Sequence, residues 1–150
     1  MAIVKPNPGE QIKVISQVDS AVTCNEDNYE KYLESLDERH LDLSGEPTRF
    51  VLKKFLTWGE QDEVDKLKAH TEGRKVQPKM SFMAEDVRLS LVEIENPDSV
   101  PDLQKLQLEK DKWGKPTRDF VGILRDMKIV NDLFNARSSS HKANDDLKKS

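Results

Sequence analysis

The residues that could carry out chemistry are few and scattered along the chain. The histidines are His40, His70 and His141, and His40 has a potential metal ligand two residues away, at Asp42. A structural zinc site commonly takes its ligands from two close pairs, and no second pair accompanies this one. The pattern therefore favours an ordinary exposed histidine beside a strand, and we expect no metal site.

Nucleophilic catalysis lacks its usual companions in this sequence. No Gly-x-Ser-x-Gly segment occurs, and the serines that precede His141 belong to a polar C-terminal stretch. Cys24, the single cysteine, has no neighbouring base or positive charge that would activate its thiol. Glu93 and Glu95 would not share one face of a helix. We therefore expect a protein without catalytic activity and without a cofactor.

Length and composition limit the class of protein. The chain has 150 residues, of which 35% are apolar and 35% charged, and this is typical of one domain with a modest core. Its net charge is −4, and its basic residues are interleaved with acidic ones, which disfavours nucleic-acid binding. The start of the chain lacks the apolar segment of a secretory signal, and no apolar run approaches the roughly 20 residues that span a bilayer. We expect a cytoplasmic protein without membrane contact.

The first half of the chain contains both strand and helix patterns. Residues 1–26 read as an irregular N-terminal arm that includes an edge strand at "QIKVIS". Asp27 and Glu30 have the spacing of a capping box, and the helix they predict has an apolar face made of Tyr29, Tyr32, Leu33 and Leu36.

A β-hairpin is expected next, followed by a short helix. Apolar residues alternate at Leu41 and Leu43 and again at Phe50 and Leu52, with turn residues at 44–47 between them. Thr57 and Glu60 form a second capping box, which predicts a short exposed helix up to Gly73.

The second half of the chain reads as helical. Residues 81–96 have the spacing of one helix, residues 102–113 place Leu103, Leu106 and Trp113 on one side, and Thr117 caps a long helix that ends near residue 136. The stretch "RSSSHKANDDLKKS" from Arg137 onward has almost nothing to bury and is expected to be disordered. The predicted fold is mainly α with a small β-hairpin (α+β). It is a single helical-bundle-like domain over residues 27–135, with a disordered C-terminal tail over 136–150.

Several apolar residues lie away from the main apolar stripes of the predicted helices. They are Leu89, Val92, Ile129 and Leu133. Either each helix is buried on two sides, or these residues form an exposed apolar strip for a partner or for self-association. Trp58 and Trp113 are expected in the core or at its edge, with an interface anchor as the alternative.

The order of these signals resembles that of the tail assembly chaperones of long-tailed bacteriophages. The segment "FVLKKFLTWGEQDEV" resembles the family's short strand and "Leu-Thr…Glu" helix start. The segment "DVRLSLVEIENPDSVPD" resembles its middle helix with a Pro/Asp loop, and "GKPTRDFVGILRDMKIVNDLF" resembles its Gly-x-Pro-Ser/Thr start of the last long helix. The resemblance covers roughly residues 41–134. It implies a non-enzymatic protein in the host cytoplasm that coats the tape-measure protein during tail assembly and recruits tail-tube subunits.

Three functions remain open at this stage. As a chaperone, the protein would bind its client through Leu89, Val92, Ile129, Leu133 and Trp58. As a virion structural subunit, such as a connector or tail accessory protein, it would form a homo-oligomer. As a small inhibitory or regulatory protein, its acidic balance would direct it to a basic surface of a host protein.

Overall fold

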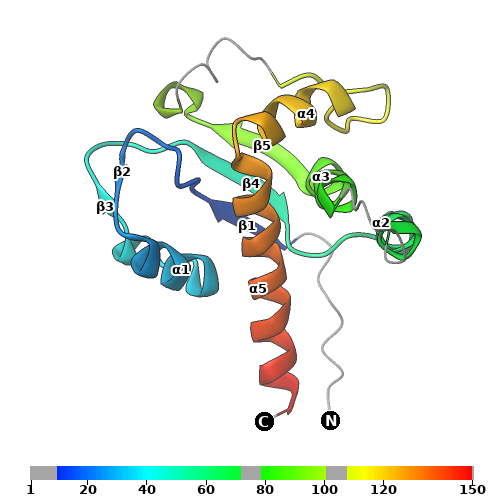
Figure 1. The fold of residues 1–150 in the computed structure, drawn as a ribbon, viewed down its shortest axis with the longest axis horizontal. Helices are drawn as coiled ribbons and strands as arrows, with labels where there is room; N and C mark the ends of the chain where they lie inside the picture. Colours follow the sequence, from blue (N-terminus) through cyan, green and yellow to red (C-terminus); the bar gives the residue numbers. More distant parts are fainter. Residues whose placement is uncertain (1–9, 72–78, 101–107, 150) are drawn as a thin grey trace.

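The computed structural model describes residues 10–71, 79–100 and 108–149, and its architecture is mixed α+β (Figure 1). A three-stranded antiparallel sheet has the order β1-β4-β5, and a two-stranded antiparallel ribbon pairs β2 with β3. The strands are β1 Gln11–Val14, β2 Val22–Thr23, β3 Asp42–Leu43, β4 Arg49–Lys53 and β5 Leu91–Glu95. The α-helices are α1 Glu26–Ser35, α2 Trp58–Thr71, α3 Lys79–Ser90, α4 Arg118–Asp126 and α5 Ile129–Lys149, and the 3-10 helices are η1 Glu38–His40 and η2 Pro97–Ser99.

Helix α5 packs on elements from both halves of the chain. It contacts strand β1 and helices α1, α3 and α4, and in Figure 1 it runs across one face of the sheet. Ile129, Val130 and Leu133 in its first turns are fully buried. The α+β class is therefore confirmed. The helical-bundle arrangement is not, because α3 and α5 also contact strands.

The predicted hairpin between β3 and β4 is wrong. Leu43 instead faces Val22 across the β2–β3 ribbon, while Phe50 in β4 faces Val14 on one side and Ile94 on the other. The edge strand near residue 11 is confirmed as β1. The alternation of apolar residues identified the strands correctly, but it carries no information about which strand pairs with which.

The predicted helix over residues 81–96 is correct only as far as Ser90. The Ser90 hydroxyl donates to the Asp86 carbonyl at 2.8 Å, and the chain then continues as strand β5 at the edge of the sheet. Leu91 faces Leu52 across the ladder. Val92 and Ile94 are β-branched and favour a strand, so pairing with β4 outweighs the helical spacing of the apolar residues.

The last predicted helix is broken into α4 and α5. Lys128 has a φ of 65°, and its N–H donates to the Arg125 carbonyl at 2.9 Å, which closes the turn. The break has a physical reason in the burial pattern. The apolar stripe that α4 buries with Phe120 and Leu124 would leave Ile129 on another side of one continuous helix.

Two other helix predictions also need correction. Helix α1 is capped by Asn25, whose side chain accepts from the Asn28 N–H at 2.8 Å, and not by Asp27. The expected helix around residue 110 is a turn, with Lys110 bridged to Pro116 in antiparallel fashion. Leu103, Leu106 and residues 1–9 of the predicted N-terminal arm lie outside the described residues. The rest of that arm, predicted to be irregular apart from one edge strand, contains both β1 and β2.

The prediction of a structureless tail from residue 136 is wrong at its start. Helix α5 continues to Lys149, and Arg137 is only 2% exposed. Its guanidinium forms an ion pair with Asp86 of α3 and donates to the Lys53 and Lys54 carbonyls after β4, at 2.9 and 3.3 Å. Arg137 was predicted to be exposed because it lies in a polar stretch and its buried partner, Asp86, is 51 residues away in the sequence.

Arg137→Ala should lower the free energy of unfolding by about 3–5 kcal/mol, because the buried Asp86 carboxylate loses its counter-charge. Urea unfolding followed by circular dichroism measures the change. Lys66→Ala is the matched control: it removes an exposed ion pair with Asp62 and should cost less than about 1 kcal/mol. Equal stability of the two variants would contradict the anchoring role of Arg137.

Candidate functional site

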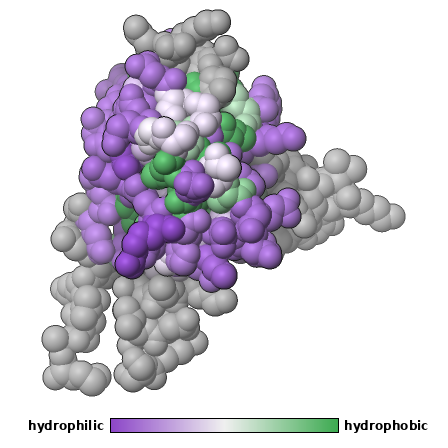
Figure 2. Space-filling model, turned by 90° about the vertical axis from the view of Figure 1, so that its left-hand side faces the viewer, coloured by the Kyte–Doolittle hydropathy of each residue, from purple (hydrophilic) through white to green (hydrophobic). Residues whose placement is uncertain are grey.

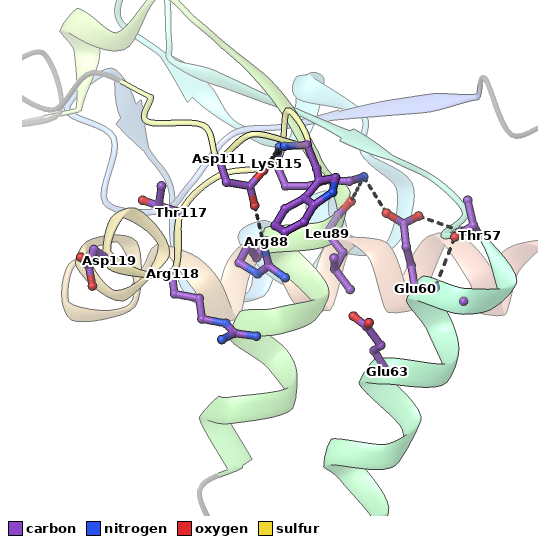
Figure 3. Close-up of a pocket in the computed structure, with 12 residues that line it drawn as sticks. Thr57, Glu60, Glu63, Arg88, Leu89, Asp111, Lys115, Thr117, Arg118 and Asp119 are labelled. Carbon is purple, nitrogen blue, oxygen red and sulfur yellow. Dashed lines mark hydrogen bonds and ion pairs between the residues drawn. The ribbon is translucent and has the colours of Figure 1, made fainter.

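A cleft of about 760 Å³ lies beside the start of helix α2. Its walls come from the first turns of α2, the end of α3, the turn over residues 109–117 and the start of α4 (Figure 3). A second hollow of about 560 Å³ lies on the other side of the α2 start, and Gly59 lines both.

The start of α2 is held by the predicted capping box. The Thr57 N–H donates to the Glu60 carboxylate at 3.0 Å, and the Glu60 N–H donates to the Thr57 hydroxyl at 3.2 Å. These two bonds satisfy backbone donors that a helix otherwise leaves without partners. They also fix the positions of Gly59, which lines the cleft, and of Trp58, which lines the second hollow.

Glu60 is the centre of a charge network inside the cleft. Its carboxylate lies 2.5 Å from the Lys115 ammonium and 3.4 Å from that of Lys53, and Lys115 also donates to the Leu89 carbonyl at 3.2 Å (Figure 3). Burial acts to raise the pKa of Glu60, but the Lys115 ammonium and the Thr57 N–H outweigh it and hold this pKa at about 2. The same contact raises the pKa of Lys115 against the opposing effect of burial.

This network suits structure better than proton transfer. A general base works best with a pKa near the working pH. A carboxylate with a pKa of about 2 that is already paired with two ammonium groups is a poor proton acceptor at neutral pH. The network instead ties the turn that carries Lys115 to the start of α2 and to β4.

The turn over residues 109–117 is built around Asp111. Its carboxylate accepts from the N–H groups of Trp113 and Lys115 at 2.9 and 3.0 Å, which lowers the pKa of Asp111. Gly114 has a φ of 76°, a conformation that glycine adopts without strain. Thr117 then caps α4, as predicted, by accepting from the Phe120 N–H at 3.2 Å. The tight turn projects Trp113 outward.

Both tryptophans of the chain are exposed at this location. Trp58 is 95% exposed and lines the second hollow, and Trp113 is 73% exposed and lines the cleft. The Lys112 ammonium lies 4.4 Å from the centroid of the Trp113 ring. The prediction that both indoles belong to the core is therefore wrong. We call the two hollows, with Trp58 and Trp113, the tryptophan surface.

The predicted apolar strip is not on the surface. Leu89 is 5% exposed, and Ile129 and Leu133 are fully buried; Val92 is half-buried in β5. Of the proposed partner-binding residues, only Trp58 is fully accessible. The sequence left Trp58 open between a core position and an interface anchor, because an indole so often fills a core and the pattern around Thr57 and Glu60 indicates only that a helix begins there.

The candidate chemical residues of the sequence are not brought together. Cys24 is half-buried, and burial raises the pKa of its thiol. Within residues 10–71, 79–100 and 108–149, no group of three or more His, Cys, Asp or Glu side chains could hold a metal ion. The side chains of His70 and His141 lie outside the described residues.

A smaller hydrophobic feature lies on another face. Figure 2 shows hydrophobic side chains gathered on the side of the molecule that carries β2 and β3, among hydrophilic ones. In this region Val18 is 38% exposed, and the cross-strand pair Val22 and Leu43 is half-buried. Acidic side chains outnumber basic ones between residues 19 and 46, so this face is negatively charged.

Comparison with protein-family models, with curated proteins and with solved structures finds no match for this chain. Among the described helices, none combines the length and apolar character that a bilayer-spanning segment requires.

Leu133→Asp should unfold the protein, because a carboxylate would replace a fully buried side chain without any partner. Trp58→Ala should change the free energy of unfolding by less than about 0.5 kcal/mol, because its indole contacts little of the protein. Thermal unfolding of both variants tests this assignment. A folded, soluble Leu133→Asp variant would show that Leu133 reaches the surface after all.

Glu60→Gln should destabilise the protein by about 1–3 kcal/mol at neutral pH, because it weakens a capping bond and two ion pairs. The pKa of Glu60 falls from its ordinary value of 4.5 to about 2 on folding. Its stabilising effect is therefore complete above about pH 4.5 and is lost as the pH falls toward 2.

Urea unfolding of wild type and Glu60→Gln across this pH range measures the effect. The difference between the two proteins should shrink as the pH falls. The control is Glu30→Gln, on an exposed position of α1, where the difference from wild type should stay near zero. If the difference in unfolding free energy between wild type and Glu60→Gln did not change with pH, ionisation of Glu60 would not be the source of its stabilising effect.

Proposed function

We propose that this protein is a non-enzymatic assembly chaperone that binds a partner protein through the tryptophan surface. The observation that carries the proposal is the exposure of both indoles, Trp58 at 95% and Trp113 at 73%. A folded protein gains little by presenting two large apolar rings to water, and exposed tryptophans are enriched among residues that dominate binding energy.

The surface has the features of a preformed docking site. The capping box and the Glu60–Lys115 ion pair hold the elements that carry the two indoles, so binding would require little ordering of the chain. Burying both rings against a client would remove a few hundred Å² of apolar area, which at about 25 cal/mol per Å² corresponds to several kcal/mol.

The proposed class of client rests on the resemblance of three sequence segments to a family of chaperones. The segments "FVLKKFLTWGEQDEV", "DVRLSLVEIENPDSVPD" and "GKPTRDFVGILRDMKIVNDLF" resemble tail assembly chaperones of long-tailed phages. The proposed client is the tape-measure protein, with tail-tube subunits as further partners, in the host cytoplasm. The first of these segments contains Trp58, and the third contains Lys115, the partner of Glu60.

An affinity pull-down from infected host cells during tail assembly, followed by mass spectrometry, tests the proposal. The wild-type protein should recover a tape-measure protein, and the Trp58→Ala/Trp113→Ala double variant should recover at least about tenfold less of it. The double variant is expected to fold, because both indoles are largely exposed, so its comparison with the wild type isolates the contribution of the surface. The Val18→Ala variant, which alters the other hydrophobic face, is the matched control and should bind normally.

Mass spectrometry of purified mature particles distinguishes the main alternative. A chaperone should be absent from the particle. Stoichiometric presence there would identify a structural subunit of the virion. Recovery of a host enzyme in place of the tape-measure protein would indicate the inhibitory role.

A further inference from the structure

The charges that line the tryptophan surface are unbalanced. Carboxylates outnumber cations there: they are Glu60, Asp62, Glu63, Asp65, Asp111 and Asp119, against Arg88, Lys115 and Arg118 in the lining and Lys112 beside Trp113. The surface offered to a partner is therefore negatively charged.

These cations already have partners within the protein, and that of Lys112 is the Trp113 ring. Lys115 is paired with Glu60 at 2.5 Å. Arg88 is paired with Glu85 at 2.5 Å and lies 3.5 Å from Asp111. Arg118 lies 3.7 Å from Glu85. An anionic ligand would have to compete with these carboxylates, so the cleft is unsuited to phosphate or nucleic acid.

Two of the carboxylates remain available to a partner. Glu63 and Asp119 are exposed, and neither forms an ion pair within the described part of the chain. Figure 3 shows Glu63 pointing from α2 toward Leu89 at the end of α3. Glu63 and the Trp113 indole thus line the same cleft.

We infer that the tryptophan surface binds a partner segment in which Lys or Arg side chains alternate with apolar ones. The inference rests on the proposed protein-binding function and names the chemistry of the partner. An ammonium or guanidinium group is attracted both to the face of an exposed indole and to a nearby carboxylate. The Lys112 ammonium already lies over the Trp113 ring, so this indole attracts a cation, and a partner's cation would replace Lys112 there or take the opposite face. The apolar side chains of the segment would pack on Trp58 and Leu56 in the second hollow.

A second copy of this chain is a poorer occupant. A symmetric dimer through the tryptophan surface would bring the same excess of carboxylates together from both subunits. Like charges placed opposite each other across an interface oppose association.

Tryptophan fluorescence gives a direct test. Both tryptophans of the chain lie in the surface, so a blue shift of emission on adding a tryptophan-free peptide reports binding at this location. The probe is a short synthetic amphipathic peptide of Leu and Lys, and the matched peptides carry Glu or Ser in place of Lys. We expect the Lys peptide to bind and to shift the emission, and the Glu peptide to do neither.

Substitutions in the protein test where the Lys side chains of the peptide bind. Glu63→Lys should weaken binding of the Lys peptide by about tenfold and leave the fold unchanged, because Glu63 is exposed. Glu30→Lys makes the same charge change on α1 and should leave affinity unchanged at about 0.15 M salt, where distant charges are screened. Trp113→Phe should remove part of the emission shift, and Trp58→Phe the rest.

Each contrary outcome has a distinct meaning. Equal binding of the Ser or Glu peptide would overturn the preference for cations and leave the proposed protein-binding function intact. Binding of the Lys peptide without an emission shift, or unaffected by Glu63→Lys, would place the peptide elsewhere, such as on residues 19–46, and overturn the inference. Failure of the Lys peptide to bind would also overturn it. Normal peptide binding together with a pull-down that recovers no client would overturn the proposed function alone.

Discussion

The buried ion pair between Arg137 and Asp86 is the interaction on which the arrangement of this fold most depends. It joins α5 to α3, and two further guanidinium N–H groups donate to the Lys53 and Lys54 carbonyls where the chain leaves β4. Three elements that are far apart in the sequence therefore meet at one side chain that is 2% exposed. A buried charge is tolerated only with such a complete set of partners, so the pair permits few alternative packings.

The position of the candidate site follows from this anchor. Arg137 holds the backbone of Lys53, and the Lys53 side chain lies 3.4 Å from Glu60 in the first turn of α2. Glu60 in turn binds Lys115 on the turn that presents Trp113. A continuous set of polar contacts thus connects the buried core to both exposed indoles. The rigidity that a docking surface needs comes from contacts beneath it, while the indoles themselves are left free to meet a partner.

The charges in the cleft favour a structural role for Glu60 over proton transfer. The most perturbed carboxylate of the cleft, Glu60, is held ionised by its partners, and this stabilises the folded chain without providing a group that exchanges protons near neutral pH. What the cleft does present is apolar aromatic area beside an excess of negative charge. These are the properties by which proteins select partners through shape and charge, and they underlie both the proposed chaperone function and the inferred preference for a basic, amphipathic segment.

Some elements of this fold could be predicted from local sequence, and others depend on contacts between distant segments. Local signals were sufficient for the capping box at Thr57 and Glu60, the cap at Thr117, the edge strand at β1 and the α+β class, because each depends on residues a few positions apart. The pairing of β3 with β2, the change from α3 to β5 after Ser90 and the break at Lys128 depend on contacts with distant segments, which local periodicity does not contain. The sequence by itself determined where α2 and α4 begin, because the capping residues Thr57, Glu60 and Thr117 lie next to the helix starts that they fix. Only the tertiary structure decided which apolar residues were covered: it buried Leu89, Ile129 and Leu133, enclosed Arg137 and left Trp58 and Trp113 in solvent, because burial depends on what the rest of the chain places against a side chain and not on the side chain itself.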